Sequence, residues 1–409
     1  MLFTLMMLLV YKLGSAIPVP FMNKEVVASL FNADKNGVLS LADLFSGGAF
    51  KNMTIFALNI YPYVTASIII QLLTIAIPSL EALAREGEEG KKKLAQFTRY
   101  GTVVFALVQA VGITVGLFNR AIIEQTFLAK FIVVITLTAG TAFLMWLGEQ
   151  ITENGIGNGI SIIIFAGILG KAPQAVVQTL QLASQNQIHA VKLILYLVLA
   201  LIVIAGVVAI QEGTRKIPVQ YAKRVVGRKM YGGQSTHIPL KVLMAGVIPV
   251  IFSTSILAFP QTIAMFLDPQ SGYVKFVQKW LTTGTAPGVY VYSVLNIILI
   301  IFFTYFYTAI QFNPIEYANN LKQYGGFIPG IRPGKPTSDY LNKVLSRITI
   351  VGAIALAFIA VLPAVITTIA GYPIGLGGTG LLIVVGVALE TMKQIEAQML
   401  TRHYKGFLN

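Results

Sequence analysis

Few side chains in this sequence have the types and spacing that catalysis or metal binding requires. Gly155, Gly157 and Gly159 are spaced like a phosphate-binding loop, but an apolar stretch follows them instead of Lys-Ser/Thr. Asp34 and Asn36 resemble the start of a calcium-binding loop, but the later oxygen ligands are absent. We therefore expect both segments to form plain turns.

The other reactive residue types are too scarce or too scattered to form a catalytic set. The chain has no cysteine, so disulfides and thiolate metal sites are impossible, and its three histidines lie in or beside predicted loops. Glu149 and Glu390 lie near the ends of apolar stretches, where ion pairing or snorkelling of the carboxylate is expected. The sequence predicts neither an enzyme nor a bound cofactor.

The composition indicates an all-α protein that crosses a membrane many times. Hydrophobic residues make up 56 % of the chain and charged residues 11 %, whereas a soluble domain has roughly 25 % charged residues. The first apolar stretch begins at Met1, and we expect a natural N-terminal segment to precede it. Ten candidate spans follow one another at about residues 1–17, 53–77, 100–118, 131–150, 158–178, 191–211, 242–266, 289–311, 347–370 and 379–399.

The basic residues predict the orientation of these spans. Twenty of the 30 lysines and arginines lie in one set of alternate loops and in the C-terminal tail, and nine lie in the other loops. The positive-inside rule then places both termini in the cytoplasm, and it explains the net charge of +14 without a nucleic-acid partner. Residues 1–185 and 186–409 hold five spans each. Because five is odd, the second half starts from the opposite side of the membrane, as in an inverted repeat.

The second span is the most unusual apolar stretch, because polar residues and a proline interrupt it. Pro62 cannot bond back to the preceding turn, so we expect the helix to kink there. At 3.6 residues per turn, Ile60, Val64, Ser67 and Gln71 fall on one face. A part-polar stripe on a membrane helix faces protein or water, so this face either lines a pore or packs against other helices.

Two predicted cytoplasmic loops, residues 212–241 and 312–346, are long and rich in polar residues. Prolines on both sides of Arg332 stiffen the tip of the second loop. Loops of this length are usually functional. Together they suggest a docking platform for a cytoplasmic partner, although both loops could also be simple connectors.

Several stretches, in the same order along the chain, resemble the SecY family of bacterial protein-conducting channels. The resemblance implies ten helices in a clamshell around an hourglass pore, which a plug closes and which opens sideways to lipid. The stretches are IPVP (17–20), FSGGA (45–49), 63–72, QFTRYG (96–101), 144–165, QSTHIPLKV (234–242), AGVIP (245–249), NP (313–314), PGIRPG (329–334) and GGTGLLIVV (377–385).

The resemblance also implies roles for individual residues. The residues that match the family's pore ring are Ile60, Val64, Ile160, Ile164, Ile251 and Ile383. The segment that matches the family's plug is about residues 39–50, and it includes Leu41, Phe45, Ser46, Gly47 and Gly48. The lateral gate lies between the second and third spans and the seventh and eighth, with polar positions at Gln71, Ser161 and Ser255. The docking positions are Arg224, Arg228, Lys229 and Arg332.

By the same resemblance, the partners are the SecE and SecG subunits, the SecA ATPase, the ribosome, signal peptides, unfolded preproteins and membrane lipid. Ribosomal RNA is the one nucleic acid expected among them. Three positions depart from the family pattern, with Asn59 for the usual Gly, Tyr61 for Met and Leu243 for Asn. An inverted-repeat transporter of a small solute is the alternative, but the scarcity of charge inside the spans favours a channel.

Overall fold

The computed structural model describes most of the chain. Leu41, Phe45 and Arg228 lie outside the described residues, so the predictions for them have no structural counterpart. The described residues are 1–33, 46–184, 190–221, 224–226, 229–231, 235–264, 266–268, 270–282, 286–370 and 378–405.

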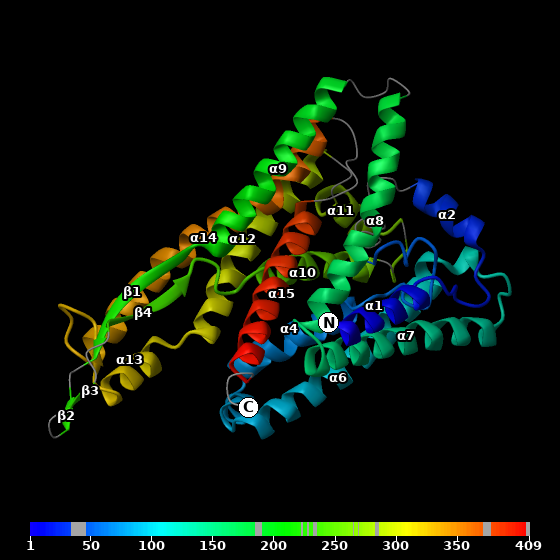
Figure 1. Cartoon of the computed structure of the whole chain (residues 1–409). Helices are drawn as coiled ribbons and strands as arrows, with labels where there is room; N and C mark the ends of the chain where they lie inside the picture. Colours follow the sequence, from blue (N-terminus) through cyan, green and yellow to red (C-terminus); the bar gives the residue numbers. More distant parts are fainter. Residues whose placement is uncertain are drawn as a thin grey trace.

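Helices dominate the structure, and each of the ten predicted spans contains one (Figure 1). The α-helices are α1 (Leu2–Gly14), α2 (Lys24–Ala33), α4 (Tyr61–Ala76), α5 (Pro78–Arg85), α6 (Glu88–Val111), α7 (Phe127–Asn154), α8 (Gly159–Ser184), α9 (Ala190–Glu212), α10 (Ile248–Ala264), α11 (Gly272–Trp280), α12 (Ala286–Gln311), α13 (Pro314–Gln323), α14 (Lys335–Ala370) and α15 (Gly378–Lys405). A π-helix, η1 (Gly112–Leu117), and a 3-10 turn, η2 (Asn119–Ala121), follow α6.

Several of these helices are suited to a bilayer by length and composition alone. Among the residues described, four helical segments qualify, and a fifth is obtained if α4 and α5 are counted as one bent span. Shorter apolar helices occur in α1, α8, α9 and α10. The four long segments are Glu88–Leu117, Phe127–Asn154, Pro287–Gln323 and Lys335–Leu362.

The predicted kink at Pro62 is wrong. Residues 50–60 form turns rather than helix, and α4 begins at Tyr61 with Pro62 in its first turn. Proline fits that position because its ring fixes a helical φ and the missing N–H would have no intrahelical partner. The sharp bend comes instead at the next proline, Pro78, where α4 and α5 meet at 101°.

The helices pack in two groups. In the N-terminal part α4 packs on α6, α6 on α7 and α7 on α8; in the C-terminal part α10 packs on α12, α12 on α14, and α15 on α14 and α9. The groups touch where α4 meets α10 and where α8 meets α15. Ion pairs join neighbouring helices, Arg99 to Glu149 at 2.8 Å and Lys393 to Glu212 at 3.0 Å. The first confirms that Glu149 is paired.

A small sheet joins the two long loops, which an all-α prediction did not anticipate. β1 (Thr214–Tyr221) is its central strand and pairs antiparallel with β4 (Ser235–Lys241) and with β5 (Gly326–Phe327). Ile217 and Val219 are buried while the residues next to them are mostly exposed, so β1 alternates as a strand with one buried face should. A second hairpin, β2 (Arg224–Val226) with β3 (Lys229–Tyr231), extends from the first.

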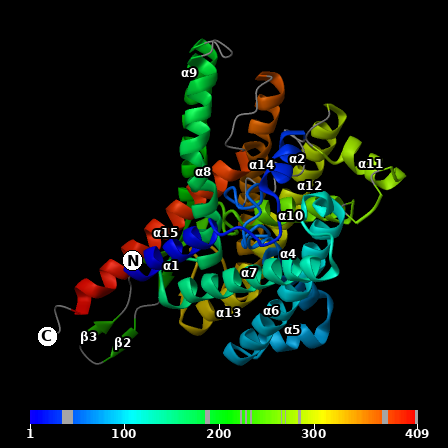
Figure 2. The ribbon, with the colours of Figure 1, turned by 90° about the vertical axis from the view of Figure 1, so that its right-hand side faces the viewer.

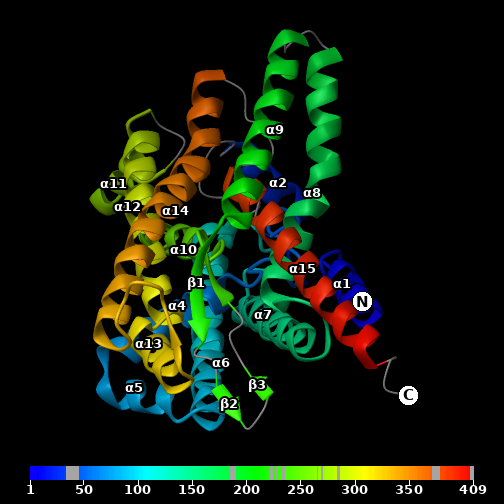
Figure 3. The ribbon, with the colours of Figure 1, turned by 60° about the vertical axis from the view of Figure 1, so that its left-hand side comes forward.

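One end of the molecule carries this sheet, and the opposite end carries α2 and α11. Figures 2 and 3 show the β2–β3 hairpin and α11 at opposite margins of the molecule. The start of α1 and the end of α15 lie on the same side of the molecule in Figures 2 and 3.

Candidate pore constriction and gate

The six residues predicted for the pore ring lie in one apolar cluster. Ile60, Val64, Ile164 and Ile383 are buried, and Ile160 and Ile251 are half-buried against the same cluster. They come from α8, α10, α15, α4 and the turn before α4, so elements distant in sequence meet here. Branched aliphatic side chains in such a ring can part around a chain and close again without leaving a polar hole.

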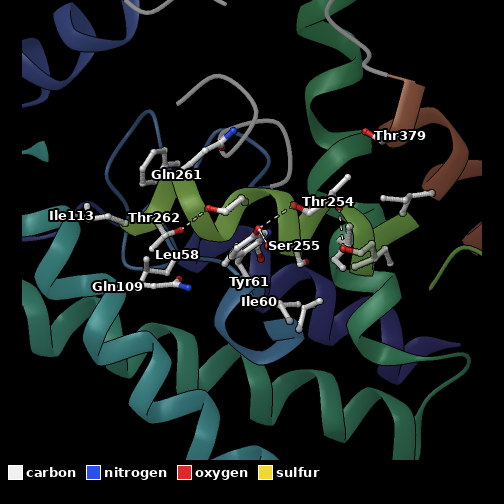
Figure 4. Close-up of a pocket in the computed structure, with 18 of the residues that line it drawn as sticks. Leu58, Ile60, Tyr61, Gln109, Ile113, Thr254, Ser255, Gln261, Thr262 and Thr379 are labelled. Carbon is white, nitrogen blue, oxygen red and sulfur yellow. Dashed lines mark hydrogen bonds between the residues drawn. The ribbon is translucent and has the colours of Figure 1, made fainter. Parts of the chain in front are cut away.

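A cavity of about 140 Å³ lies beside five of these residues, and Figure 4 shows it between the α4 and α10 segments. Ile160 does not line it. Instead its Cδ1 lies 2.6 Å from where a Cβ on Gly148 would be, so it packs on α7 where glycine leaves room. The cavity wall is otherwise mixed, with Gln109 and Ile113 from the α6–η1 segment and Tyr292 from α12.

Tyr61 forms the hydrogen bond that crosses between α4 and α10. Its hydroxyl donates to the backbone carbonyl of Ser255 at 3.0 Å, and the carbonyl of Thr254 lies 3.4 Å away (Figure 4). We call this contact between α4 and α10 the seam. The sequence marked Tyr61 only as a departure from the family pattern, and nothing in the sequence indicated its backbone acceptor.

The other side of α10 is held to α12 by side chains that are both buried. The Ser253 hydroxyl donates to Asn296 Oδ1 at 2.6 Å. The ring of Phe252, the residue before Ser253, packs edge-on against Phe303 of α12 with the ring centres 5.6 Å apart. Sequence reasoning missed this pair, although an amide within an apolar span is a signal that could have found it.

The three polar positions predicted for the gate do not share one contact in the described part of the chain. Gln71 donates to Ser67 within α4 at 3.3 Å, and the amide of Ser161 donates to Asn158 at the start of α8. Of the three, only Ser255 lines the cavity. The structure therefore brings one of them to the seam.

Asn59 and Leu243, the other two departures from the family pattern, have clear surroundings. Asn59 has φ of 51°, a left-handed conformation that Gly adopts freely and that Asn tolerates better than most residues. Leu243 is buried, together with Val247 and Ile300, in the apolar cluster to which α9, α10, α12, α14 and α15 contribute. An apolar side chain suits that position.

The described end of the predicted plug packs against α8. Ser46 and Phe50 are buried, and the Ser46 hydroxyl accepts a hydrogen bond from the Phe50 amide at 3.1 Å. A Cβ at Gly47 would stand 2.6 Å from the Gly167 carbonyl oxygen, and its φ is 65°. Gly47 is thus a close-approach position where a larger residue cannot fit.

Arg332 is exposed at the tip of a turn that its neighbours hold in shape. Gly330 and Gly334 have φ of 83° and 102°, and the Thr337 hydroxyl donates to the Arg332 carbonyl at 2.8 Å. Arg224 and Lys229 lie on the paired strands β2 and β3 of the other loop. The pairing of β1 with β5 brings these two loops together.

No group of three or more His, Asp or Glu side chains within the described residues is placed to hold a metal ion. The arrangement as a whole is that of a multi-pass helical membrane protein with an apolar cluster where its two groups of helices meet and a cavity beside the α4–α10 seam.

Comparisons with known proteins agree with this class. The SecY family model matches residues 54–392. A protein translocase subunit SecY from Halalkalibacterium halodurans is 50 % identical over 418 residues, covering 100 % of this chain and 96 % of that protein. The chain belongs to the SecY family; it is a protein-conducting channel subunit of a translocase and not an enzyme. The alternative of a small-solute transporter is therefore set aside.

Solved structures share the fold. A structure described as a protein-conducting channel has a TM-score of 0.69 at 22 % identity, with 98 % of this chain and 92 % of that chain covered. The channel of a canine ribosome–channel complex from the endoplasmic reticulum has a TM-score of 0.67 at 20 % identity, with the same coverage. The ten-helix clamshell expected from the sequence is the fold of this family.

Proposed function

We propose that the six ring residues form the constriction through which unfolded secretory proteins cross the cytoplasmic membrane. In this proposal α4 and α6 part from α10 and α12 so that membrane-protein segments leave sideways into lipid. The plug, about residues 39–50, closes the pore beside the ring. The observation that carries the proposal is the cavity, because five ring residues and the α4–α10 seam line the same space.

The energy for transport comes from partners that dock on the two long loops. SecA or a ribosome is the driving partner, and Arg332 with Arg224, Arg228 and Lys229 forms the docking surface. Arg332 suits a carboxylate or phosphate of a partner because its guanidinium is exposed on a turn of fixed shape. The related canine channel, which is found in a ribosome complex, supports the ribosome as a partner.

The remaining assignments follow the same proposal. SecE and SecG complete the complex, signal peptides and unfolded preproteins are its cargo, and membrane lipid surrounds the open gate. Both termini lie in the cytoplasm, and the halves 1–185 and 186–409 move relative to each other. The excess of basic residues in alternate loops supports this orientation.

The ring is tested by the double substitution Ile60→Asn with Ile164→Asn. An apolar neck stays dry only while its lining cannot bind water, so the closed channel of this variant should leak small ions in planar bilayers. The matched control is Ile68→Asn with Ile163→Asn, which changes α4 and α8 in the same cluster but away from the cavity.

The control should lose stability without a leak, because each buried unpaired polar group costs roughly 1–3 kcal/mol. Thermal unfolding measured on the same preparations separates the two effects. An ion-tight Ile60→Asn/Ile164→Asn channel would remove these residues from the constriction.

The docking surface is tested by Arg332→Glu. This change should abolish ATP-driven translocation while the protein still inserts, because it reverses the charge that meets the partner. Lys343→Glu, an exposed cation on α14 on the same side, is the control and should keep most of the activity. Normal translocation by Arg332→Glu would exclude this loop from the mechanism.

A further inference from the structure

The short helix α11 lies outside the channel machinery described so far, and its faces differ in chemistry. Ser271 caps its start by accepting a hydrogen bond from the Val274 amide at 3.3 Å. Val274 and Val277 are buried toward the protein. The chain after α11 is tied to α10, because Gln261 donates to the Leu281 carbonyl at 2.7 Å.

One flank of α11, beside the buried valines, carries large aromatic rings. Phe276 is 55 % exposed and Trp280 is 37 % exposed. Tyr273 lies on the same side, with its hydroxyl bound to the Pro260 carbonyl of α10 at 3.2 Å. At about 100° per residue these three rings fall within a sector of roughly 60°. Phe266, just before α11, adds another exposed ring.

Two lysines form the edge of this aromatic face. Lys275 and Lys279 are exposed and lie one turn apart, so they share one side of the helix next to the rings. Lys279 Nζ lies 5.5 Å from the centre of the Trp280 ring. Residues 272–280 contain no acidic residue, and the nearby Asp268 carboxylate accepts from the Gln270 amide at 2.9 Å.

The location of α11 suits a membrane surface. It lies between α10 and α12 in the chain, and at the margin of the molecule opposite the β2–β3 hairpin (Figures 2 and 3). Exposed aromatic rings flanked by lysines are typical of helices that lie in the interface between lipid acyl chains and headgroups. Anionic phospholipids attract lysines at that depth.

We infer that α11 is an interfacial helix that binds anionic phospholipid headgroups in the leaflet opposite the β4–β1–β5 sheet. Phe276 and Trp280 enter the acyl boundary, and Lys275 and Lys279 hold the phosphate groups. Because Gln261 and Pro260 of α10 form hydrogen bonds with the α11 segment, the bound lipid also restrains the C-terminal end of α10.

The chain offers its own reporter, since it has only two tryptophans, Trp146 and Trp280. Trp146→Phe leaves Trp280 as the single fluorophore. This protein is placed in vesicles of phosphatidylcholine. The quencher is brominated phosphatidylglycerol or brominated phosphatidylcholine, and its bromines lie either near the headgroup or deep in the lipid acyl chain.

We expect the shallow bromines to quench Trp280 more than the deep ones, and brominated phosphatidylglycerol to quench at lower content than brominated phosphatidylcholine. Adding Lys275→Gln and Lys279→Gln should reduce this preference for phosphatidylglycerol by roughly fivefold per lysine. Lys24→Gln, on α2 at the same end of the molecule, is the matched control and should leave the preference unchanged.

Either of two results would overturn the inference. Trp280 that no brominated lipid quenches lies in water or under another protein, and not in the interface. Equal quenching by the two brominated lipids, in the Trp146→Phe protein and in its lysine variant alike, means that the helix has no site for anionic headgroups. A parallel Trp280→Phe protein, which keeps Trp146, confirms through quenching of Trp146 that the vesicles hold inserted channel.

Discussion

The two sides of α10 are held in different ways. Toward α12, the buried Ser253 and Asn296 side chains share a 2.6 Å hydrogen bond. Toward α4, one tyrosine hydroxyl meets a backbone carbonyl, and a cavity of about 140 Å³ lies alongside. In the gate proposed above, this difference predicts that α10 stays with α12 and separates from α4.

The energies of the two contacts point the same way. Breaking a buried polar pair exposes two groups that no longer have partners, at a cost of roughly 1–3 kcal/mol for each group left unsatisfied. Within the described residues, the hydrogen bonding across the seam comes from one neutral hydroxyl, that of Tyr61, and such a bond is worth roughly 0.5–1.5 kcal/mol. Where a cavity lies at an interface, few dispersion contacts are lost when the two surfaces part. The seam is therefore the cheaper of the two contacts to open.

The largest effect is expected on the α12 side. Asn296→Ala should lower the free energy of unfolding by about 1–2 kcal/mol, because it removes the 2.6 Å acceptor and leaves the buried Ser253 hydroxyl only a longer contact, 3.3 Å, to the backbone carbonyl of residue 296. The measurement is thermal unfolding of the purified protein in detergent. Thr304→Val is the control, since the Thr304 hydroxyl donates only along α12, to the Ile300 carbonyl. Equal losses of stability in the two variants would mean that the Ser253–Asn296 hydrogen bond does not stabilise the α10–α12 contact.

A smaller effect, on opening rather than on stability, is expected at the seam. Tyr61→Phe removes the hydroxyl but keeps the ring, so opening should become easier by about 1 kcal/mol, or roughly fivefold. Export of a precursor with a defective signal sequence measures this change. Tyr292→Phe removes a hydroxyl from the same cavity on α12 and serves as the control. If both variants export this precursor alike, Tyr61 does not hold the seam.

The smallest effect is expected at Thr254. Its hydroxyl donates along α10 to the carbonyls of Val250 and Ile251, both at 3.0 Å. Thr254→Val keeps the backbone carbonyl that faces Tyr61, so unfolding and precursor export should change by less than about 0.5 kcal/mol. A change in export as large as that of Tyr61→Phe would show that side chains of α10, and not its backbone, form the seam.

Hydropathy predicted where the ten helices lie, because long apolar runs leave few alternatives in lipid. It misplaced the start of α4, since Pro62 stabilises a first turn as readily as it breaks a helix interior. The sheet was missed because β1 contains Pro218 and pairs with the two-residue β5 more than 100 residues away. Contacts of that separation leave no periodicity in the sequence.

The candidate site was predictable to the extent that it depends on side-chain type. The ring positions came from a family resemblance, and the apolar cluster brings them together. Ile160 shows the limit, since its packing on Gly148 depends on a helix contact that the sequence does not reveal. Tyr61 shows another limit, because its acceptor is a carbonyl, which every residue has.

The pairing of Gln220 and Tyr221 with Phe327 and Gly326 has a mechanical consequence. The strand β1 continues from α9, and β5 lies between α13 and α14, so these few backbone bonds couple the ends of separate long helices like a crossbar. The apolar cluster of Ile217, Leu321 and Leu345 stiffens that crossbar against α13 and α14. A force that a partner applies to the exposed turn at Arg332 is therefore passed to α9, α13 and α14 together, instead of bending one loop.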